Sequence, residues 1–307
     1  IYDQKEVRGY HAGLYNVCCG DREVFSASLT KGFRDGDTLL TWAYTAQDHQ
    51  NRSDMTSSTS NSNFGKTGAV DFNNRMKNRS TYETEHSFLI TLTSKHYFFG
   101  GNAPTTFSLV YAKESGNVKY PTFDTYTSWP GDYKSKAFGY EFNLNDDSSS
   151  LLYIPIPNDP LVCYSYKCYE EGSGDALQRE SEILNFLYNV WGLEDYAGQI
   201  APRDAGNFPW QTSLDLNIVQ ELPGFREGDA FVITLALENL LNFIDDDKGI
   251  IKYGYYSGRV PVLDLRIVDG ERYDYSRNAF RYSFDDPFNI DRSTTQSLWR
   301  ASLGIQY

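Results

Sequence analysis

Apolar and polar residues alternate along most of the chain. The last segment is the clearest case: apolar Trp299, Ala301, Leu303, Ile305 and Tyr307 alternate with Arg300, Ser302, Gly304 and Gln306. Successive side chains of a β-strand point to opposite faces, so this pattern predicts strands with one apolar and one polar face. It predicts nine strands in all, at 24–33, 38–45, 86–97, 105–112, 212–222, 231–239, 260–268, 278–285 and 299–307.

The connections between these strands alternate in length. Short connections span 34–37, 99–104, 223–229 and 269–276, and long ones span 46–84, 113–210, 240–259 and 286–296. Because consecutive strands of an antiparallel meander reverse direction, this order places every long connection at the same end of the sheet. Short turns at one end and long loops at the other are typical of a transmembrane β-barrel, whose long loops are extracellular.

The longest connection contains one predicted helix, at 173–193. Ser173 or Asp175 could cap its start, and Gly192 stands at its end. Its apolar residues recur near helical spacing, at Leu177, Ile183, Leu184, Leu187, Val190 and Trp191. We therefore expect one short surface helix lying on the loops.

The polar faces of the strands distinguish a soluble sandwich from a membrane barrel. A sandwich would expose a face rich in Lys and Glu, whereas these faces carry mostly Ser, Thr, Asn, Gly and Ala. Small polar residues suit a crowded, watery lumen. The few charges, which we expect to point into that lumen in ion pairs or against a plug, are Glu238, Asp264, Arg266, Arg281 and Arg300.

Aromatic residues near the ends of the apolar faces favour the same interpretation. The pairs are Phe25 and Phe33, Trp42 and Tyr44, Phe107 and Tyr111, and Trp299 and Tyr307. Barrels carry aromatic girdles on both sides of an apolar band about 25 Å tall. The pattern thus predicts an all-β fold, an antiparallel transmembrane barrel; a large secreted β-sandwich is the alternative.

Composition agrees with a β-rich protein. The 307 residues include 24 Tyr and 19 Phe, which favour strands. A formal net charge of −13 argues against nucleic acid as a partner, because phosphates are neutralised by basic residues. The sequence has no apolar run of about 18 residues, which a transmembrane helix would need.

Four cysteines indicate an oxidising compartment. Cys18 and Cys19 are adjacent, and Cys163 and Cys168 are five residues apart, all in turn-rich polar surroundings. The spacing lacks the ligand pairs of a zinc site, so we interpret the four as surface disulfides. A vicinal Cys18–Cys19 bridge and a cross-loop pairing are both open, since the connectivity does not follow from sequence.

The strand count raises the question of barrel closure. Nine is odd, whereas bacterial single-chain barrels have an even number of strands, and an open edge is not viable in lipid. Residues 1–23 read as an extracellular loop or strand end, and no signal peptide precedes them. We therefore expect residues 24–307 to form the C-terminal part of a larger barrel.

Several motifs resemble the TonB-dependent receptors of the bacterial outer membrane, in their Oar-like branch. The terminal "SLWRASLGIQY" is similar to the last barrel strand, and "FVITLALENLLNFIDDDKG" (231–249) to the "NLxN" region before it. The Oar-like features are "LLYIP" (151–155) and "YAGQIAPRDAGNFPWQTSLDLNIVQELP" (196–223), with "TWAYTAQDHQ" (41–50) and "ETEHSF" (83–88) as a strand and loop pair.

This resemblance implies a 22-stranded barrel with an N-terminal plug domain, which is absent from this chain. It implies ligand capture by extracellular loops and passage of large or peptidic cargo through the plugged lumen. The implied partners are outer-membrane lipid, the remaining barrel and plug, the TonB complex, a surface lipoprotein, and the barrel-assembly machinery, which recognises the terminal Tyr307. A barrel that only anchors surface loops, or a secreted glycan-binding sandwich, would be the alternative functions.

The sequence predicts no enzyme and no cofactor, because its four His are scattered and no catalytic motif occurs. Exposed aromatic residues in the loops could stack on a ligand, and loop packing would explain them as well. These candidates are Tyr126, Trp129, Tyr253, Tyr255 and Tyr256. Asp245, Asp246 and Asp247 are weak Ca²⁺ candidates, and a solvated acidic loop is the better interpretation.

Overall fold

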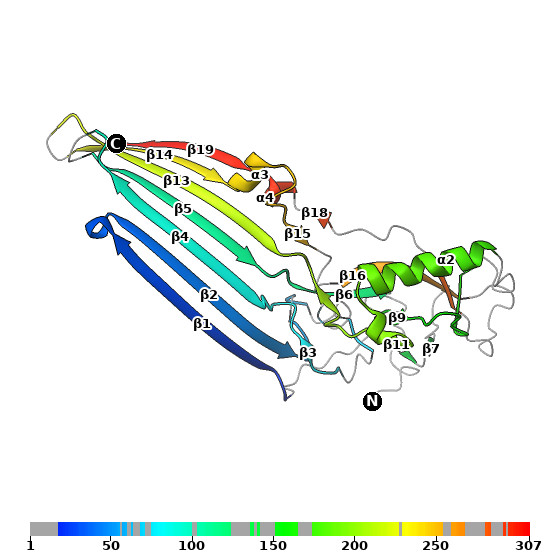
Figure 1. The fold of residues 1–307 in the computed structure, drawn as a ribbon. Helices are drawn as coiled ribbons and strands as arrows, with labels where there is room; N and C mark the ends of the chain where they lie inside the picture. The colour runs from blue at the N-terminus through cyan, green and yellow to red at the C-terminus, as the bar shows by residue number, and fades with distance from the viewer. Residues whose placement is uncertain are drawn as a thin grey trace.

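The computed structural model describes residues 18–55, 57–59, 63, 68–70, 75–99, 103–123, 136–137, 140–141, 151–164, 174–226, 229–253, 259–267, 280–283, 291–292 and 294–307. Seven long strands form one antiparallel sheet in the order β1-β2-β4-β5-β13-β14-β19 (Figure 1). Their bounds are β1 Asp21–Phe33, β2 Thr38–Asn51, β4 His86–His96, β5 Thr105–Glu114, β13 Gln211–Pro223, β14 Ala230–Glu238 and β19 Arg300–Gln306. The short β3 (Asn78–Arg79) pairs with the end of β2.

The register places the apolar faces of all seven strands on one side of the sheet. Leu29 is opposite Trp42, Trp42 is opposite Ile90, and the pairing continues strand by strand to β19. There Leu235 is opposite Leu303. Since a shift of one residue would move a strand's whole apolar set to the other face, the register and the alternation agree along the sheet.

The connections sort to the two ends of the sheet as the sequence predicts. The turns β1–β2, β4–β5 and β13–β14 lie at one end, close to the C-terminus (Figure 1). The β1–β2 turn contains the one-turn 3-10 helix η1 (Arg34–Gly36). The connections β2–β4, β5–β13 and β14–β19 lie at the opposite end, and we refer to them together as the cap.

Two of the nine predicted strands are not part of this sheet. β16 (Arg259–Ile267) and β17 (Phe280–Ser283) pair with each other in a separate sheet of the cap, ordered β10-β17-β16-β6-β12. β16 also runs parallel to β6, which comes from a different connection. The placement of Asp264, Arg266 and Arg281 on the barrel wall was therefore wrong; the predicted turn at 269–276 lies outside the described residues.

The cap is built from many short elements. Its strands are β6 Val118–Phe123, β7 Lys136–Ala137, β8 Tyr140–Glu141, β9 Tyr153–Ile154, β10 Val162–Cys163, β11 Gln199–Ile200, β12 Gly206–Asn207, β15 Lys252–Tyr253 and β18 Asp291–Arg292. Its helices are α2 Gly174–Asn185, the π-helix η4 Phe186–Val190, the 3-10 helix η5 Glu194–Tyr196, α3 Leu240–Ile244 and α4 Thr294–Ser297. No helix among the described residues is long and apolar enough to cross a membrane.

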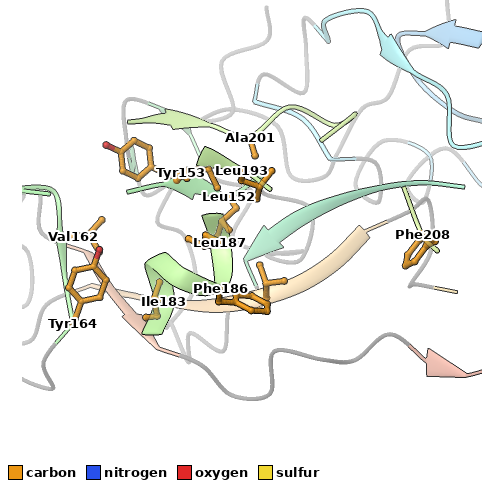
Figure 2. Close-up of a cluster of buried hydrophobic side chains, with 12 residues drawn as sticks. Leu152, Tyr153, Val162, Tyr164, Ile183, Phe186, Leu187, Leu193, Ala201 and Phe208 are labelled. Atoms are coloured by element: carbon orange, nitrogen blue, oxygen red, sulfur yellow. The ribbon is translucent and has the colours of Figure 1, made fainter. Parts of the chain in front are cut away.

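A buried hydrophobic cluster lies in the cap and takes none of its members from the seven long strands (Figure 2). Its members are Leu152, Tyr153, Ile154, Val162, Tyr164, Ile183, Phe186, Leu187, Leu193, Ala201, Phe208 and Val262. The motif "LLYIP" thus supplies part of a packed core. Burial of such side chains contributes about 1.5–3 kcal/mol each, so the cap is a folded unit.

The predicted helix is present and packs into this cluster. It runs through α2 and continues as η4, and Gly192 follows with a left-handed φ of 71°. The backbone N–H of Leu193 donates to the carbonyl of Leu187 at 3.0 Å, which closes the helix end as the predicted glycine cap requires. Leu177 and Val190 remain exposed, while Ile183 is buried, so the helix has one core face.

Candidate membrane-facing surface and its junction with the cap

The apolar face of the sheet is exposed at both edges and half-buried across the central strands. At the two edges Leu29 and Leu303 each expose 68% of their surface, and Ile305 exposes 71%. Aliphatic residues occupy the middle of the face: Leu29, Leu40, Ile90, Leu92, Leu109, Leu216, Ile218, Ile233, Leu235, Leu303 and Ile305. A contiguous apolar surface of this extent marks a surface that contacts an apolar environment or a partner.

Aromatic side chains gather at both ends of this face. At the cap end Tyr44, Phe88 and Trp210 form one group, with ring centroids 4.8 and 6.2 Å apart. Trp299 packs edge-on against Phe243 of α3 at 5.0 Å. At the turn end, one group holds His96, Phe98 and Phe107 and the other holds Phe225, Phe231 and Tyr307.

The turns are staggered along the sheet, and this stagger can be compared with the one that a closed barrel requires. The β1–β2 hairpin ends at the pair Phe33–Thr38. Measured along the strands, the β4–β5 hairpin extends two residues beyond the level of that pair. The β13–β14 hairpin extends three residues beyond the end of the β4–β5 hairpin. Successive hairpins are two strand spacings apart across the sheet, which is about 9.6 Å. Their ends are offset by two to three residues along the strands, which is about 7–10 Å. The line of turns is therefore inclined to the strand normal by about 40°, and strands in closed barrels tilt by about 35–45°.

The spacing of the aromatic residues along the strands gives the length of the apolar face. Phe25 and Phe33, Phe88 and His96, and Trp299 and Tyr307 are each separated by eight residues, which is about 26 Å along a strand. At a tilt of about 40° this becomes about 20 Å in height. The distance between the aromatic rows is thus close to the about 25 Å apolar band of outer-membrane barrels.

The opposite face of the sheet carries mostly small polar residues, with a few larger apolar ones such as Leu39 and Leu89. Hydroxyl pairs link neighbouring strands, as between Ser26 and Thr45 at 3.1 Å and between Thr30 and Thr41 at 3.0 Å. Arg300 forms an ion pair with Glu238 at 3.2 Å across β14 and β19, which is the interstrand pairing expected for this arginine. These hydroxyl groups therefore find partners within the sheet.

The terminal residue is held in place by the β13–β14 turn. The Tyr307 hydroxyl donates to Asp229 Oδ2 at 2.8 Å, and its ring lies 4.6 Å from that of Phe231. Phe225, in the same turn, contacts both rings. The chain end is thereby anchored to the turn, which explains why this strand does not fray.

The "NLxN" motif joins two strands to both ends of the third long connection. Asn239 has a left-handed φ of 51°, and its N–H donates to Asp215 Oδ1 of β13 at 2.8 Å. Its side-chain amide donates to the carbonyls of Gly249 and Ser297, at 2.9 and 2.7 Å. A Cβ at Gly249 would collide with Asn239 Oδ1, so glycine is required there.

A buried arginine joins the cap to the end of β2. Arg203, of the "APRDA" stretch, is 1% exposed and donates to the carbonyl and the side-chain oxygen of Asn51, at 3.1 and 3.0 Å. Asp54 is fully buried nearby and accepts hydrogen bonds from Asn51 and Ser80 at 2.6 and 2.7 Å. Burial alone would raise the pKa of Asp54, but the charge of Arg203 and these hydrogen bonds outweigh it and lower that pKa.

A second polar cluster fixes the next part of the cap. Arg79 donates to Glu83 Oε1 at 2.8 Å, to Glu85 Oε2 at 3.1 Å and to Asn207 Oδ1 at 3.0 Å. Glu83 also accepts from the backbone N–H of His49 in β2 at 2.7 Å. These residues come from β2, β3, the segment before β4 and β12, so the cap segment 203–207 is bound to the rim of the sheet at two points.

Sequence reasoning missed this junction. Asp54 begins a Ser- and Thr-rich stretch that reads as an exposed loop, and Arg203 is two residues from Ala201 of the core. The only signal in the sequence was the "APRDA" motif. It marked Arg203 as a motif residue but did not indicate what its side chain contacts.

Of the five predicted ligand residues, Tyr253 alone lies within the described residues. Tyr126, Trp129, Tyr255 and Tyr256 lie outside the described residues, and Tyr253 ends the short β15.

The Asp245 turn follows α3 and is internally bonded. Asp245 accepts from the backbone N–H of Asp247 at 3.0 Å and pairs with Lys248 at 3.1 Å, and these contacts lower its pKa. Asp246 lies in the same turn, where its carbonyl accepts from Asn242 at 3.2 Å. Within the described part of the chain, no group of three or more acidic, His or Cys side chains is arranged to hold a metal ion.

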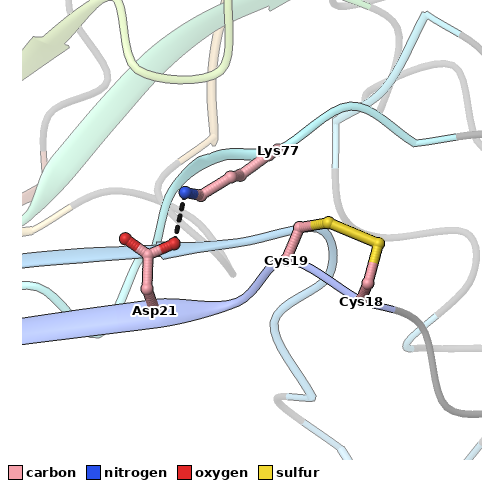
Figure 3. The surroundings of a disulfide bond; sticks show 4 residues. All are labelled: Cys18, Cys19, Asp21 and Lys77. Carbon is pink, nitrogen blue, oxygen red and sulfur yellow. Dashed lines mark ion pairs between the residues drawn. A yellow bond between two sulfur atoms is a disulfide. The ribbon is translucent and has the colours of Figure 1, made fainter.

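Of the two pairings left open by the sequence, the structure has the vicinal one. Cys18 and Cys19 form a disulfide immediately before β1, and Asp21 next to it pairs with Lys77 (Figure 3). Cys163 is also disulfide-bonded, and Cys168 lies outside the described residues.

Comparison of the chain with protein-family models, curated proteins and solved structures found no match. The family resemblance therefore rests on the motifs alone.

Proposed function

We propose that the seven-stranded sheet is part of the wall of a transmembrane β-barrel in a bacterial outer membrane. The observation that carries the proposal is the combination of one continuous apolar face, aromatic rows at both of its borders and a stagger equivalent to a tilt of about 40°. In this arrangement the apolar face contacts lipid, and the hydroxyl-rich face lines the lumen.

The secreted-sandwich alternative is less well supported. The inner face of a sandwich is buried against a second sheet. Here Phe25 exposes 62% of its surface and Leu303 68%, and the buried cluster of the described residues lies wholly in the cap. An apolar face that is packed with aliphatic residues yet uncovered is stable in lipid and costly in water.

The two edges of the sheet support completion by further strands. In the part of the chain that the structure describes, β1 pairs only with β2, and β19 only with β14. Unpaired backbone groups cost several kcal/mol each in lipid. Strands outside this sequence would pair with both edges, giving the 22-stranded barrel that the resemblance implies.

Transport is the second level of the proposal and rests on the motif resemblance. The protein would be a TonB-dependent receptor of the Oar-like branch, with the cap as the extracellular surface that captures large or peptidic cargo. A plug outside this sequence would fill the lumen and couple to the TonB complex. The attachment of the cap to the end of β2 through Arg203 and Glu83 supports a fixed capture surface above the lumen.

Two measurements test the two levels. Membrane fractionation of cells that express the full-length protein should leave it in the outer membrane after urea or carbonate extraction, with the cap open to added protease. Recovery as a monodisperse soluble protein without detergent refutes the barrel. The coding sequence upstream of Ile1 should encode a plug and a TonB box; a gene whose start codon falls close to Ile1 refutes the transporter and leaves an anchor.

A further inference from the structure

The disulfide before β1 joins two neighbours in the chain and closes no loop between distant segments. Cys18 and Cys19 are one position apart, and both are exposed at the cap end of the strand (Figure 3). A disulfide stabilises a fold mainly by constraining the unfolded chain, and this effect grows with the length of the loop that it closes. The bridge between Cys18 and Cys19 therefore adds almost nothing to the stability of the fold, so stability does not account for it.

The backbone at this bridge is held in a conformation that residues other than glycine avoid. Cys19 has a left-handed φ of 85°, which costs free energy for a residue with a side chain. The ring that two adjacent cysteines close leaves the backbone between them little freedom, and opening the bridge releases Cys19 from this constraint. The oxidised form thus carries a local cost that the dithiol form can lose.

The disulfide of Cys163 provides a contrast within the same chain. Cys163 is disulfide-bonded and 3% exposed, and its neighbours Val162 and Tyr164 belong to the buried cluster of the cap. A thiolate must reach a sulfur atom to exchange with it, so solvent access decides which bridge reacts. Exposed or strained disulfides are the labile ones. The bridge between Cys18 and Cys19 meets both conditions, and the buried Cys163 is shielded from attack.

Other contacts hold the start of β1 when the bridge opens. Asp21, the first residue of β1, forms an ion pair with Lys77 and is opposite Gln50 of β2 in the sheet register (Figure 3). Arg22 donates to Gln47 Oε1 at 2.7 Å. Because none of these contacts involves a cysteine, opening the bridge changes positions 18 and 19 and leaves the strand in register.

We propose that Cys18 and Cys19 form a reversible exchange site for small thiols at the cap end of the sheet. A thiolate attacks the sulfur of one cysteine, forms a mixed disulfide with it and releases the other cysteine as a thiolate. A second thiolate attacks the external sulfur of the mixed disulfide and releases the remaining cysteine. Two thiols thereby become one external disulfide, and their two electrons and two protons end on the cysteines. An external disulfide reverses both steps.

The test compares the two bridges in one protein. The full-length protein, purified without reductant, is incubated with reduced glutathione and alkylated, and the labelled peptides are quantified by mass spectrometry. Cys18 and Cys19 should be labelled at least about tenfold faster than Cys163, because their bridge is accessible without local opening of the fold. A glutathione adduct of Cys18 or Cys19 should appear first, and oxidised glutathione should restore the bridge.

A double variant separates exchange from stability. Cys18→Ser combined with Cys19→Gly removes both sulfur atoms and places at position 19 a residue that tolerates the left-handed φ. This variant should form no glutathione adduct at positions 18 and 19, and it should keep the urea midpoint of the wild type.

The outcomes separate this site from the proposed function. Equal labelling rates of the two bridges, or a wild-type protein that forms no adduct at Cys18 or Cys19, overturn the exchange site. A bridge that oxidised glutathione does not restore, or a lower urea midpoint of the double variant, also overturns it. The site needs only an exposed bridge on the folded sheet. A protein that is soluble without detergent and still forms the adduct would therefore refute the barrel and leave the exchange site standing.

Discussion

Leu92 is the position where the membrane assignment can be tested most directly. It lies on β4, four residues from Phe88 and four from His96, which border the apolar face. This is about 13 Å from each border along the strand, or about 10 Å in height after the tilt. Leu92 therefore lies near the midplane of the proposed lipid band.

Leu92→Arg should oppose insertion by about 2–4 kcal/mol, the cost of arginine at the midplane of a barrel's lipid face. At 1.4 kcal/mol per factor of ten, the ratio of inserted to uninserted protein should fall by about 30- to 700-fold. The measurement is the fraction of full-length protein that stays in the membrane through a urea titration.

The control is Thr93→Arg, one residue away on the opposite face. Thr93 is opposite Leu39 and Ser108 on the hydroxyl-rich face, so the added arginine would reach the proposed lumen. This variant should insert nearly as well as the wild type. If the two arginine variants insert equally, or if Leu92→Arg is the more soluble and equally stable protein, the lipid-facing assignment is refuted.

Four further predictions concern contacts at the two ends of the sheet. Asn239→Ala should destabilise the protein by about 1–3 kcal/mol for each of the two carbonyls it leaves unpaired, measured as a lower urea midpoint; an unchanged midpoint contradicts this role. Arg203→Leu should cost about 3–5 kcal/mol by leaving Asp54 buried without its cation, and should speed proteolysis of the cap. Because the pKa of Asp54 is lowered in the folded state, its stabilisation should be complete above about pH 4 and be lost as pH falls through the folded-state pKa; Asp54→Asn should remove that acid dependence. Tyr307→Phe, which keeps the ring and loses the bond to Asp229, should assemble better than deletion of Tyr307, and equal assembly of the two refutes the anchoring role of the ring.

The alternation of residues was sufficient to predict the seven long strands and their two faces. A strand needs only a period of two to separate its faces, and antiparallel neighbours joined by short turns pair in order, so both features are local. The helix ending at Gly192 was predictable for the same reason, because its spacing and its cap lie within one segment.

The cap was decided by contacts between segments far apart in the sequence. β16 and β17 alternate as clearly as the seven long strands, yet β16 pairs in parallel with β6, and no local pattern encodes that choice of partner. Arg203 reaches Asn51 across 152 positions, and its charge lowers the pKa of the buried Asp54. The sequence by itself thus determined which face of each strand is apolar, and the tertiary structure decided which strands share a sheet, because pairing energy depends on partners that only folding brings together.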